Sequence, residues 1–344
     1  MRFMKLALMA AAVAFVLPGL SVADGPVAEF PEYIPFSPDE SPEGVAVDKV
    51  GNVYVSVDVP GHAELWKFTP TGEKTVLAQF PNPGRVGLAV DATGNVYMVA
   101  AGGVYVVDPE GVFAHLPGTE NINYPDGLAF DQRGNLYITD FFSLSSGPDS
   151  CMDTWGMGGI YRFPKGGVSA ELWLRHELLT GNCVGLLGYP AGANGIQFFR
   201  GDLYVINSDR GTIVQIPVRP DGSAGEPTVW ATLQPVPESP LTQMGFPALG
   251  DGFAFDVHGN AYIAIVSLEA IVRINAHDMS QETLAFWPLA PLDTPTSIAF
   301  GTGKGGRTSI FIVNMGWAAA FGVPNPPGTG LIKMDVGIPG LPLP

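Results

Sequence analysis

Hydrophobic and polar residues repeat along this chain in a block that reads polar-Gly-Φ-Ala-Φ-Asp, a Gly-containing turn, and then Asn-Φ-Tyr-Φ, where Φ is apolar. Clear copies begin at Glu43, Val86 and Asp126. The two-residue periodicity on both sides of the turn is the pattern of a β-hairpin. The Asp and Gly-Asn residues supply turn chemistry and positive φ. Each block therefore predicts one hairpin.

Weaker copies begin at Asn194, Asp251 and Thr296, so the chain has six blocks, spaced 43, 40, 68, 57 and 45 residues apart. Another pair of predicted strands follows each hairpin, for example within residues 64–80. Six units of four antiparallel strands are typical of a β-propeller. The last unit has only three strands, and residues 27–34 are expected to add the outer strand that closes the ring. The predicted fold class is an all-β, six-bladed β-propeller.

The composition supports this architecture and excludes some partners. The 344-residue chain has 17 Lys and Arg against 33 Asp and Glu, a formal charge of −16 at pH 7. Nucleic acids and anionic membrane surfaces need basic patches, so neither is expected as a partner. Because 46% of the residues are hydrophobic, the chain is also not intrinsically disordered. The 44 Gly and 32 Pro suit many short strands and tight turns.

The N-terminus has the pattern of a secretory signal peptide. Arg2 and Lys5 precede a 15-residue apolar stretch that ends at Leu20, and small residues follow at a cleavage site. The apolar stretch is shorter than the roughly 20 residues of a membrane span. The sequence therefore predicts a signal peptide over residues 1–23 and a single propeller domain over residues 24–344, secreted or periplasmic, with no membrane span.

Strand alternation divides the predicted propeller into two faces. The innermost strand of each blade begins at one face, here called the strand-start face, and turns into the second strand at the other, the hairpin face. The residue before the Gly of each block, or before the Ser that replaces it in the sixth, lies at the strand-start face, beside the central channel. Around the ring this position is occupied by Glu43, Val86, Asp126, Asn194, Asp251 and Thr296.

Three carboxylates and one carboxamide of this ring converge on a single axis. Without a counter-ion, carboxylates so close together repel one another and raise one another's pKa values. A hard divalent cation resolves this conflict; Ca²⁺ is the expected ion, since it binds six to eight oxygens in flexible geometry, and another divalent cation is the alternative. The ring has no Cys or His, which disfavours zinc and copper. The alternative is that these side chains only cap strands at the channel mouth.

The blocks around Glu43 (SPEGVAVD), Asn194 (GANGIQF), Asp251 (GDGFAFD) and Thr296 (PTSIAFGTGKGG) resemble the gluconolactonase/regucalcin (SGL) family of calcium-dependent six-bladed propeller hydrolases. The resemblance covers about residues 25–340. It implies that Glu43, Asn194 and Asp251 bind the metal, with Asp251 also acting as the acid/base residue. The third block departs from the family's Asn-Asp-Gly, because Pro125 precedes Asp126. Specificity for sugar lactones is therefore less strongly implied than metal binding.

The chemistry implied is metal-assisted hydrolysis of a small molecule, a lactone, another ester or a phosphotriester. Asp251 would transfer the proton, and Asp126 would contact the substrate. Asp140 and Asn207 end the second strands of their blades near the channel and are further candidate substrate contacts. Two alternatives stay open: a non-catalytic propeller that binds a ligand or a protein, and a pseudoenzyme that keeps calcium for stability.

Two further features come from loops at the strand-start face. Cys151 and Cys183 are the only cysteines, and an exported chain permits a disulfide between them; two separate thiols are the alternative. His62 is the one histidine predicted in a loop at this face, so it is the alternative general base.

Overall fold

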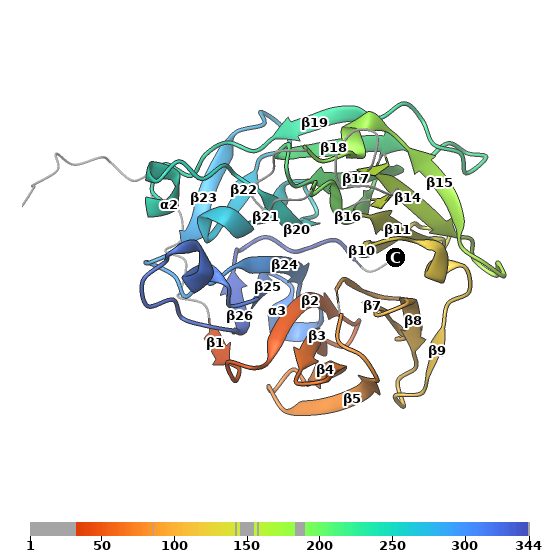
Figure 1. Ribbon diagram of the computed structural model, residues 1–344, viewed down its shortest axis with the longest axis horizontal. Coiled ribbons are helices and arrows are strands. Elements are labelled where there is room, and N and C mark those ends of the chain that lie inside the picture. Colours follow the sequence, from red (N-terminus) through yellow and green to blue (C-terminus); the bar gives the residue numbers. More distant parts are fainter. Residues whose placement is uncertain are drawn as a thin grey trace, which may run out of the picture.

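The computed structural model describes residues 32–84, 86–141, 143–144, 155–156, 158–182 and 190–342. Within these ranges, six four-stranded antiparallel sheets are arranged as blades around a central axis (Figure 1). This confirms the predicted all-β, six-bladed propeller. The predicted signal peptide and both cysteines lie outside the described residues. No helix in the described part of the chain has the length and apolar character to cross a bilayer.

The first three blades run outward from the axis in chain order. Their strands are β2 (Ser41–Val47), β3 (Val53–Val59), β4 (His62–Phe68) and β5 (Lys74–Phe80); β6 (Leu88–Val90), β7 (Val96–Ala100), β8 (Gly103–Val107) and β9 (Phe113–His115); and β10 (Pro125–Phe130), β11 (Leu136–Asp140), β14 (Gly159–Phe163) and β15 (Glu171–Arg175).

The last three blades repeat this order, except that the outer strand of the sixth comes from the N-terminus. Their strands are β16 (Ala193–Phe199), β17 (Asp202–Asn207), β18 (Thr212–Pro217) and β19 (Thr228–Thr232); β20 (Gly250–Phe255), β21 (Ala261–Ile265), β22 (Ala270–Ile274) and β23 (Gln281–Phe286); and β24 (Pro295–Phe300), β25 (Ser309–Asn314), β26 (Gly330–Asp335) and β1 (Glu32–Pro35).

Strand β1 closes the ring as predicted. It pairs antiparallel with β26, from Glu32 opposite Lys333 to Pro35 opposite Gly330 (Figure 1). Residues 27–31 of the predicted strand lie outside the described residues. The pairing joins the first described residues to the sixth blade, so the ring is held together by contacts between segments far apart in the sequence.

Short elements lie in the connections between strands. They are the hairpin β12 (Ser143–Leu144) and β13 (Trp155–Gly156), the helical turns α2 (Pro240–Gln243) and α3 (Gly303–Gly306), and the 3₁₀ turns η1 (Thr119–Asn121), η2 (Glu177–Leu179), η3 (Val266–Leu268) and η4 (Ala318–Phe321).

The hydrophobic core lies between neighbouring blades, because each sheet buries both of its faces. In β3, Val53, Val55 and Val57 pack toward the sixth blade, in a cluster with Val313. Tyr54 points to the opposite side and packs in a cluster with Met98 of the second blade. A one-residue slip in register would exchange these two faces. The alternation read from the sequence therefore fixes the strand register.

The repeated Asp and Asn-Φ-Tyr residues of the blocks build the turns at the hairpin face. Asp48 Oδ1 accepts hydrogen bonds from the backbone N–H groups of Val50 (3.0 Å) and Asn52 (2.9 Å). Its Oδ2 accepts from Asn52 Nδ2 (2.6 Å) and the Tyr54 hydroxyl (3.1 Å). The same four contacts recur around Asp131 and Asp256. These aspartates are structural turn residues.

Candidate functional site

The ring residues occupy irregularities in the innermost strands. The pairing of strand β2 with β3 shifts register between Pro42 and Val45, the stretch that contains Glu43. Equivalent shifts in β10, β16, β20 and β24 fall at Asp126, Asn194, Asp251 and Thr296. A β-bulge re-aims a side chain and is common next to active sites. The sequence analysis placed these residues in one register but did not predict the bulges.

Five of the six ring residues are followed by a glycine, which close contact between blades requires. A Cβ atom on Gly44 would lie 2.5 Å from the carbonyl oxygen of Val86 in the next blade. On Gly127 it would lie 2.6 Å from the Asn194 oxygen, and on Gly195 2.4 Å from the Asp251 oxygen. Only glycine lets the backbones approach so closely. The polar-Gly pair therefore brings successive ring residues close together.

Hydroxyl groups tie neighbouring ring residues to one another. Ser56 Oγ donates to the carbonyl oxygen of Val86 (2.7 Å), and Thr139 Oγ1 donates to that of Asn194 (2.8 Å). Thr296 Oγ1 donates to the carbonyl oxygen of Glu43 (2.8 Å), which links the last blade to the first. These bonds hold the backbone that carries the acidic side chains.

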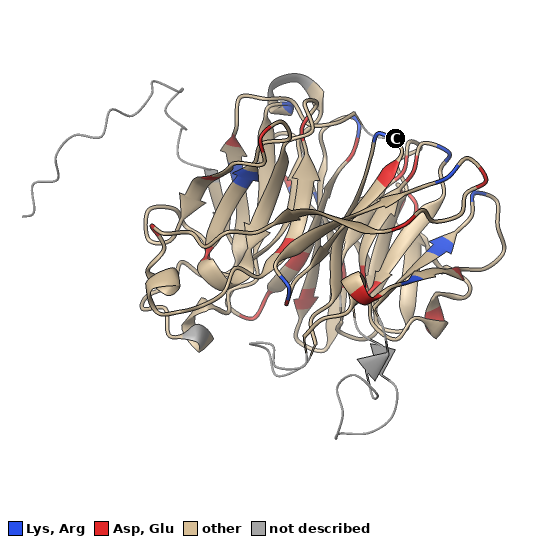
Figure 2. Cartoon of the chain, turned by 90° about the horizontal axis from the view of Figure 1, so that it is seen from above, with Lys and Arg blue, Asp and Glu red and all other residues tan. Residues whose placement is uncertain are grey.

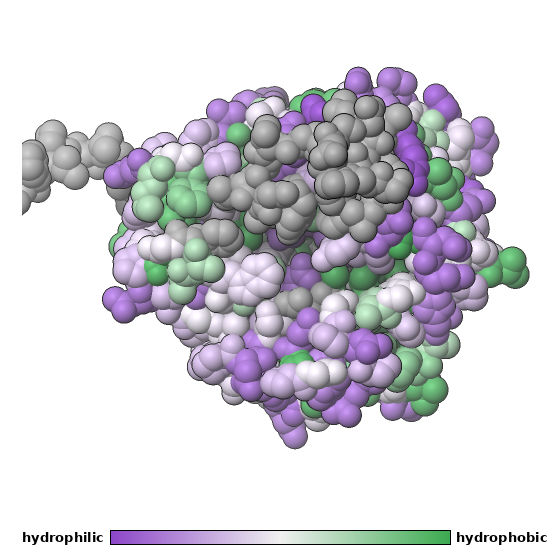
Figure 3. All heavy atoms as spheres, in the orientation of Figure 1, coloured by the Kyte–Doolittle hydropathy of each residue, from purple (hydrophilic) through white to green (hydrophobic). Residues whose placement is uncertain are grey.

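Four polar ring residues line one cavity at the strand-start face. Glu43, Asp126, Asn194 and Asp251 all line this space, which has a volume of about 490 Å³ and is called here the strand-start cavity. The same four residues line a constriction of about 60 Å³ further along the channel. They therefore lie at the base of the cavity. Figure 3 shows this face of the molecule, hollowed near the centre of the ring.

The ring acids lie in an electrostatically unfavourable environment. Burial raises the pKa of Asp126 well above its usual value, and the charges of Glu43 and Asp251 raise it further. Burial and the charge of Glu43 likewise raise the pKa of Asp251, while a hydrogen bond from Asn194 acts in the opposite direction. No Lys, Arg or His is among the described residues that line the cavity or the constriction. The excess negative charge is what a bound cation would balance.

The donor set agrees with a hard divalent cation, since carboxylate and amide oxygens are the ligands that calcium prefers. Among the described residues, no group of three or more His, Cys, Asp or Glu side chains is gathered closely enough to hold a metal ion. A site made of two carboxylates and one carboxamide is a different kind of donor set. Glu43, Asn194 and Asp251 form such a set on the wall of one cavity.

The sequence matches the model of the SMP-30/Gluconolactonase/LRE-like region over residues 41–313. This chain belongs to that family. The match spans five complete blades and the inner hairpin of the sixth, and it confirms the resemblance predicted from the block motifs. No curated protein sequence matches the chain.

Solved structures share the fold of this family member at low sequence identity. A luciferin-regenerating enzyme is 15% identical, with a TM-score of 0.63, and the match covers 90% of this chain and 97% of that one. A gluconolactonase from Xanthomonas campestris is 17% identical, with a TM-score of 0.60 and coverages of 87% and 86%. Regucalcin from Agrobacterium tumefaciens, a calcium-binding protein, is 17% identical, with a TM-score of 0.59 and coverages of 88% and 92%.

Asp140 and Asn207 are buried, and each forms hydrogen bonds to the backbone of a connection between two blades. Asp140 Oδ1 accepts the backbone N–H of Tyr124 (3.0 Å), and burial raises its pKa to about 6. Asn207 Nδ2 donates to the carbonyl oxygens of Leu178 (2.8 Å) and Thr180 (2.9 Å). Neither is among the described residues that line the strand-start cavity. Their predicted contact with substrate stays a prediction, and the observed contacts are structural.

His62 is the first residue of β4 and also lies outside the lining of this cavity. Its Nε2 is 3.0 Å from Glu64 Oε1. Glu64 also accepts hydrogen bonds from Trp66 Nε1 (2.6 Å) and Gln79 Nε2 (2.8 Å). His62, the alternative general base, is therefore separate from the ring of acids. Of the two, the ring lines the strand-start cavity and His62 does not.

Two further acids, Asp293 and Glu269, are buried behind the wall of the strand-start cavity. Asp293 accepts the backbone N–H groups of Ala318 (2.9 Å) and Gly328 (2.8 Å). Glu269 accepts the N–H of Thr294, which itself lines the cavity, and its other carboxylate oxygen is buried without a hydrogen-bond partner. Burial and, to a smaller extent, the charge of Asp293 raise the pKa of Glu269 to about 8.

The sequence analysis missed several residues of the cavity wall. Tyr124 and Trp317 lie at its mouth and are 44% and 51% exposed, and Met315 lies deeper. Met315 and Trp317 follow β25, the second strand of its blade, and Tyr124 precedes β10, the first strand of its blade. The strand alternation that placed the acids at this face also places these segments there, so it could have found them.

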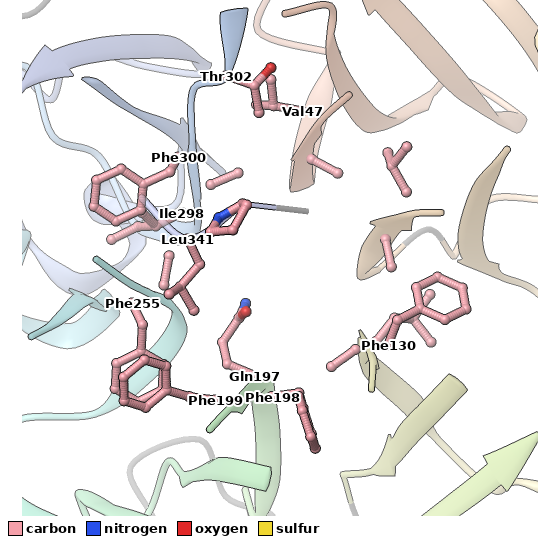
Figure 4. Close-up of a pocket in the computed structure, with 18 of the residues that line it drawn as sticks. Val47, Phe130, Gln197, Phe198, Phe199, Phe255, Ile298, Phe300, Thr302 and Leu341 are labelled. Carbon is pink, nitrogen blue, oxygen red and sulfur yellow. The ribbon is translucent and has the colours of Figure 1, made fainter. Parts of the chain in front are cut away.

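The other end of the channel holds an apolar cavity of about 530 Å³, here called the hairpin-face cavity. It is lined by the ends of the innermost strands, including Phe130, Phe255 and Phe300, and Gln197 points into it (Figure 4). Leu341, near the C-terminus, also lines it and donates its backbone N–H to the Phe255 carbonyl oxygen (3.3 Å). Figure 2 shows the C-terminus on this side of the disc, at the top of the picture.

Proposed function

We propose that this chain is an exported, calcium-dependent hydrolase that acts on a small molecule with a lactone, other ester or phosphotriester bond. The observation that carries the proposal is the convergence of Glu43, Asp126, Asn194 and Asp251, each presented by a bulge, on the base of one cavity. Family membership and the calcium-binding of regucalcin support the metal. The N-terminal pattern of Arg2, Lys5 and an apolar stretch supports export.

Glu43, Asn194 and Asp251 are the residues that would hold the ion. A calcium ion bound there would make a carbonyl or phosphoryl oxygen more electrophilic and a nearby water more acidic. The three residues come from different blades, so the rigid propeller fixes their relative positions. The hydrogen bond from Asn194 Nδ2 to Ser208 Oγ (3.1 Å) orients the amide.

Asp251 is the proposed acid/base residue. It lies on the cavity wall, where its carboxyl group can exchange a proton with a substrate bound above the ring. Asp126 is proposed to contact the substrate from the neighbouring side of the ring. The excess of acids at the base of the cavity argues against nucleic acid as a ligand.

The main competing function is a non-catalytic propeller that keeps calcium for structure and binds its ligand through loops. The two functions differ in what the loss of Asp251 does. In a hydrolase, Asp251→Asn removes turnover and leaves a folded protein. In a binding propeller there is no turnover to remove, and ligand affinity does not depend on the acid/base function of Asp251.

The test uses the purified mature protein. Elemental analysis measures bound calcium, and hydrolysis is assayed on lactone, aryl-ester and phosphotriester panels before and after chelation with EGTA. We expect about one calcium per chain, turnover of at least one panel, and loss of that turnover in EGTA with recovery when calcium is added. The absence of both calcium and turnover would refute the proposal. Bound calcium without turnover would favour the binding propeller.

A further inference from the structure

The wall of the strand-start cavity is apolar above the ring of acids. Ile122, Leu249 and Val266 are among its lining residues, in addition to Met315. At the mouth, Tyr124 and Trp317 present large aromatic surfaces to solvent. Apolar walls with a few polar groups at one point are typical of sites that bind the apolar part of a small molecule.

Two serine hydroxyl groups on this wall, those of Ser208 and Ser267, are already engaged inside the protein. Ser208 Oγ donates to the Gly250 carbonyl oxygen (2.7 Å) and accepts from Asn194 Nδ2 (3.1 Å). Ser267 Oγ donates to the Pro247 carbonyl oxygen (2.6 Å) and accepts the Leu249 N–H (2.9 Å). A polyhydroxylated ligand would have to bury its own hydroxyl groups against such a wall, and unpaired buried hydroxyls are unfavourable.

The charge of the cavity disfavours anionic ligands. Glu43, Asp126 and Asp251 lie at its base, and Glu120 lies near its mouth. Without Lys, Arg or His among the described lining residues, a carboxylate or phosphate on the substrate would meet several carboxylates and no basic side chain, and the proposed calcium ion would be its one positive partner.

From these three observations we infer that the substrate is an uncharged lactone or ester with an apolar alkyl or aryl group, and that this group packs against Tyr124, Met315 and Trp317. That the substrate contains a lactone or ester bond rests on the proposed function. That it is apolar and uncharged is inferred from the residues that line the cavity alone. Trp317 and Tyr124 are therefore specificity-determining residues. Neither carries chemistry, so their removal should change substrate preference rather than the reaction.

The first experiment compares δ-valerolactone, its propyl- and pentyl-substituted homologues, and glucono-δ-lactone. We expect kcat/KM to rise about threefold to fourfold per added methylene until the cavity is filled. The pentyl homologue, with five added carbons, should then react roughly 200-fold to 1,000-fold faster than the unsubstituted ring. Glucono-δ-lactone should be the poorest substrate. A preference for glucono-δ-lactone, or no dependence on chain length, would overturn the inference and leave the proposed hydrolase standing.

Substitutions of the aromatic residues at the mouth of the strand-start cavity test which side chains contact the apolar group of the substrate. Trp317→Ala should lower kcat/KM for the pentyl lactone about tenfold more than for δ-valerolactone, and Trp317→Phe should restore most of the loss. Tyr124→Ala is a second variant at an exposed position. Leu289→Ala is the control, because Leu289 is 64% exposed and is not a lining residue. An equal effect of Trp317→Ala on both lactones would contradict its role in specificity.

A binding measurement separates this inference from the proposed function. Calorimetry with propyl- and pentyl-substituted cyclohexanones, which cannot be hydrolysed, measures the apolar contact without turnover. If no lactone or ester is hydrolysed but affinity rises with chain length and falls in Trp317→Ala, the proposed hydrolase fails and the inference stands. If neither ketone binds more tightly than unsubstituted cyclohexanone, the inference fails whatever the catalytic result.

Discussion

The two ends of the innermost hairpins carry acidic residues in opposite environments. At the hairpin face, Asp48, Asp131 and Asp256 each accept four hydrogen bonds from their own turn. At the strand-start face, the charges of neighbouring acids act on Asp126 and Asp251, and the hydrogen bond from Asn194 to Asp251 offsets only part of this effect. Only about five residues separate Asp251 from Asp256, at the two ends of β20. The strand direction alone decides which environment each one meets.

The contrast also appears in the pKa values. Burial alone would raise the pKa of Asp91, a fourth acid of the hairpin face, but hydrogen bonds from Thr93 and Asn95 lower it. At the other face, burial and like charges both raise the pKa values of Asp126 and Asp251. The first arrangement stabilises a turn. The second leaves an excess of negative charge in the folded protein, which a bound cation can balance.

The largest expected effect is on turnover, from a substitution at the strand-start face. Asp251→Asn should lower kcat by about 100-fold to 10,000-fold, because it removes the proposed proton-transfer group. The calcium-free protein should stay folded and be no less stable than wild type, since the change removes a repulsive charge. Steady-state kinetics and thermal unfolding in EGTA measure the two effects. Full activity in this variant would remove Asp251 from the mechanism.

The matched substitution at the other end of the same strand should do the reverse. Asp256→Ala leaves the Asn260 amide, the Tyr262 hydroxyl and two backbone N–H groups without their acceptor. Loss of a buried acceptor with several donors should lower the free energy of unfolding by about 2–4 kcal/mol. Chemical denaturation measures this loss. The kcat of the remaining folded protein should equal that of wild type, and a selective loss of kcat would contradict the division between the two faces.

Calcium should stabilise only through the strand-start face. With calcium at 100 times its Kd, the free energy of unfolding should increase by about 2.7 kcal/mol. The increase should persist in Asp256→Ala and be lost in Glu43→Gln, because only Glu43 belongs to the proposed site. Thermal unfolding with calcium or EGTA tests this. An equal calcium effect in both variants would place the ion elsewhere.

The smallest expected effect is on the pH dependence of stability, through Glu269. Its pKa of about 8 in the folded protein lies above the roughly 4.3 of an unfolded glutamate. The folded state therefore binds the proton more tightly, and the stability that Glu269 contributes at low pH is lost as the pH rises toward and through 8. Glu269→Gln keeps an oxygen to accept the Thr294 N–H and removes the ionisation.

We expect Glu269→Gln to lose about 2–3 kcal/mol less stability than wild type between pH 5 and pH 7. Denaturant midpoints at both pH values measure the difference. Glu110→Gln, a substitution of an exposed glutamate, is the control. Parallel pH profiles for wild type and Glu269→Gln would show that Glu269 ionises freely in the folded protein.

Much of the fold could be read from local patterns. The two-residue alternation in the blocks predicted the strands and their buried faces, as in Val53 to Val57. The Asp and Asn-Φ-Tyr spacing predicted the turns, because those contacts form within about six residues. The candidate site was also found this way, since Glu43, Asp126, Asn194 and Asp251 share one position in the repeat. A repeat lets one local rule place residues from several blades on the same axis.

The walls of the site depend on contacts that no local pattern encodes. The bulges at Glu43 and Asp251 arise where glycine backbones press against the next blade, and the sequence does not show how close the blades come. Asp140 and Asn207 end their strands near the axis. Both hydrogen-bond to the backbone of connections between blades, and neither lines the strand-start cavity. The sequence by itself determined the repeat, the strand register and the acids of the ring. Only the tertiary structure decided which polar groups face the cavity and that its walls are apolar, because both depend on how neighbouring blades and long connections pack.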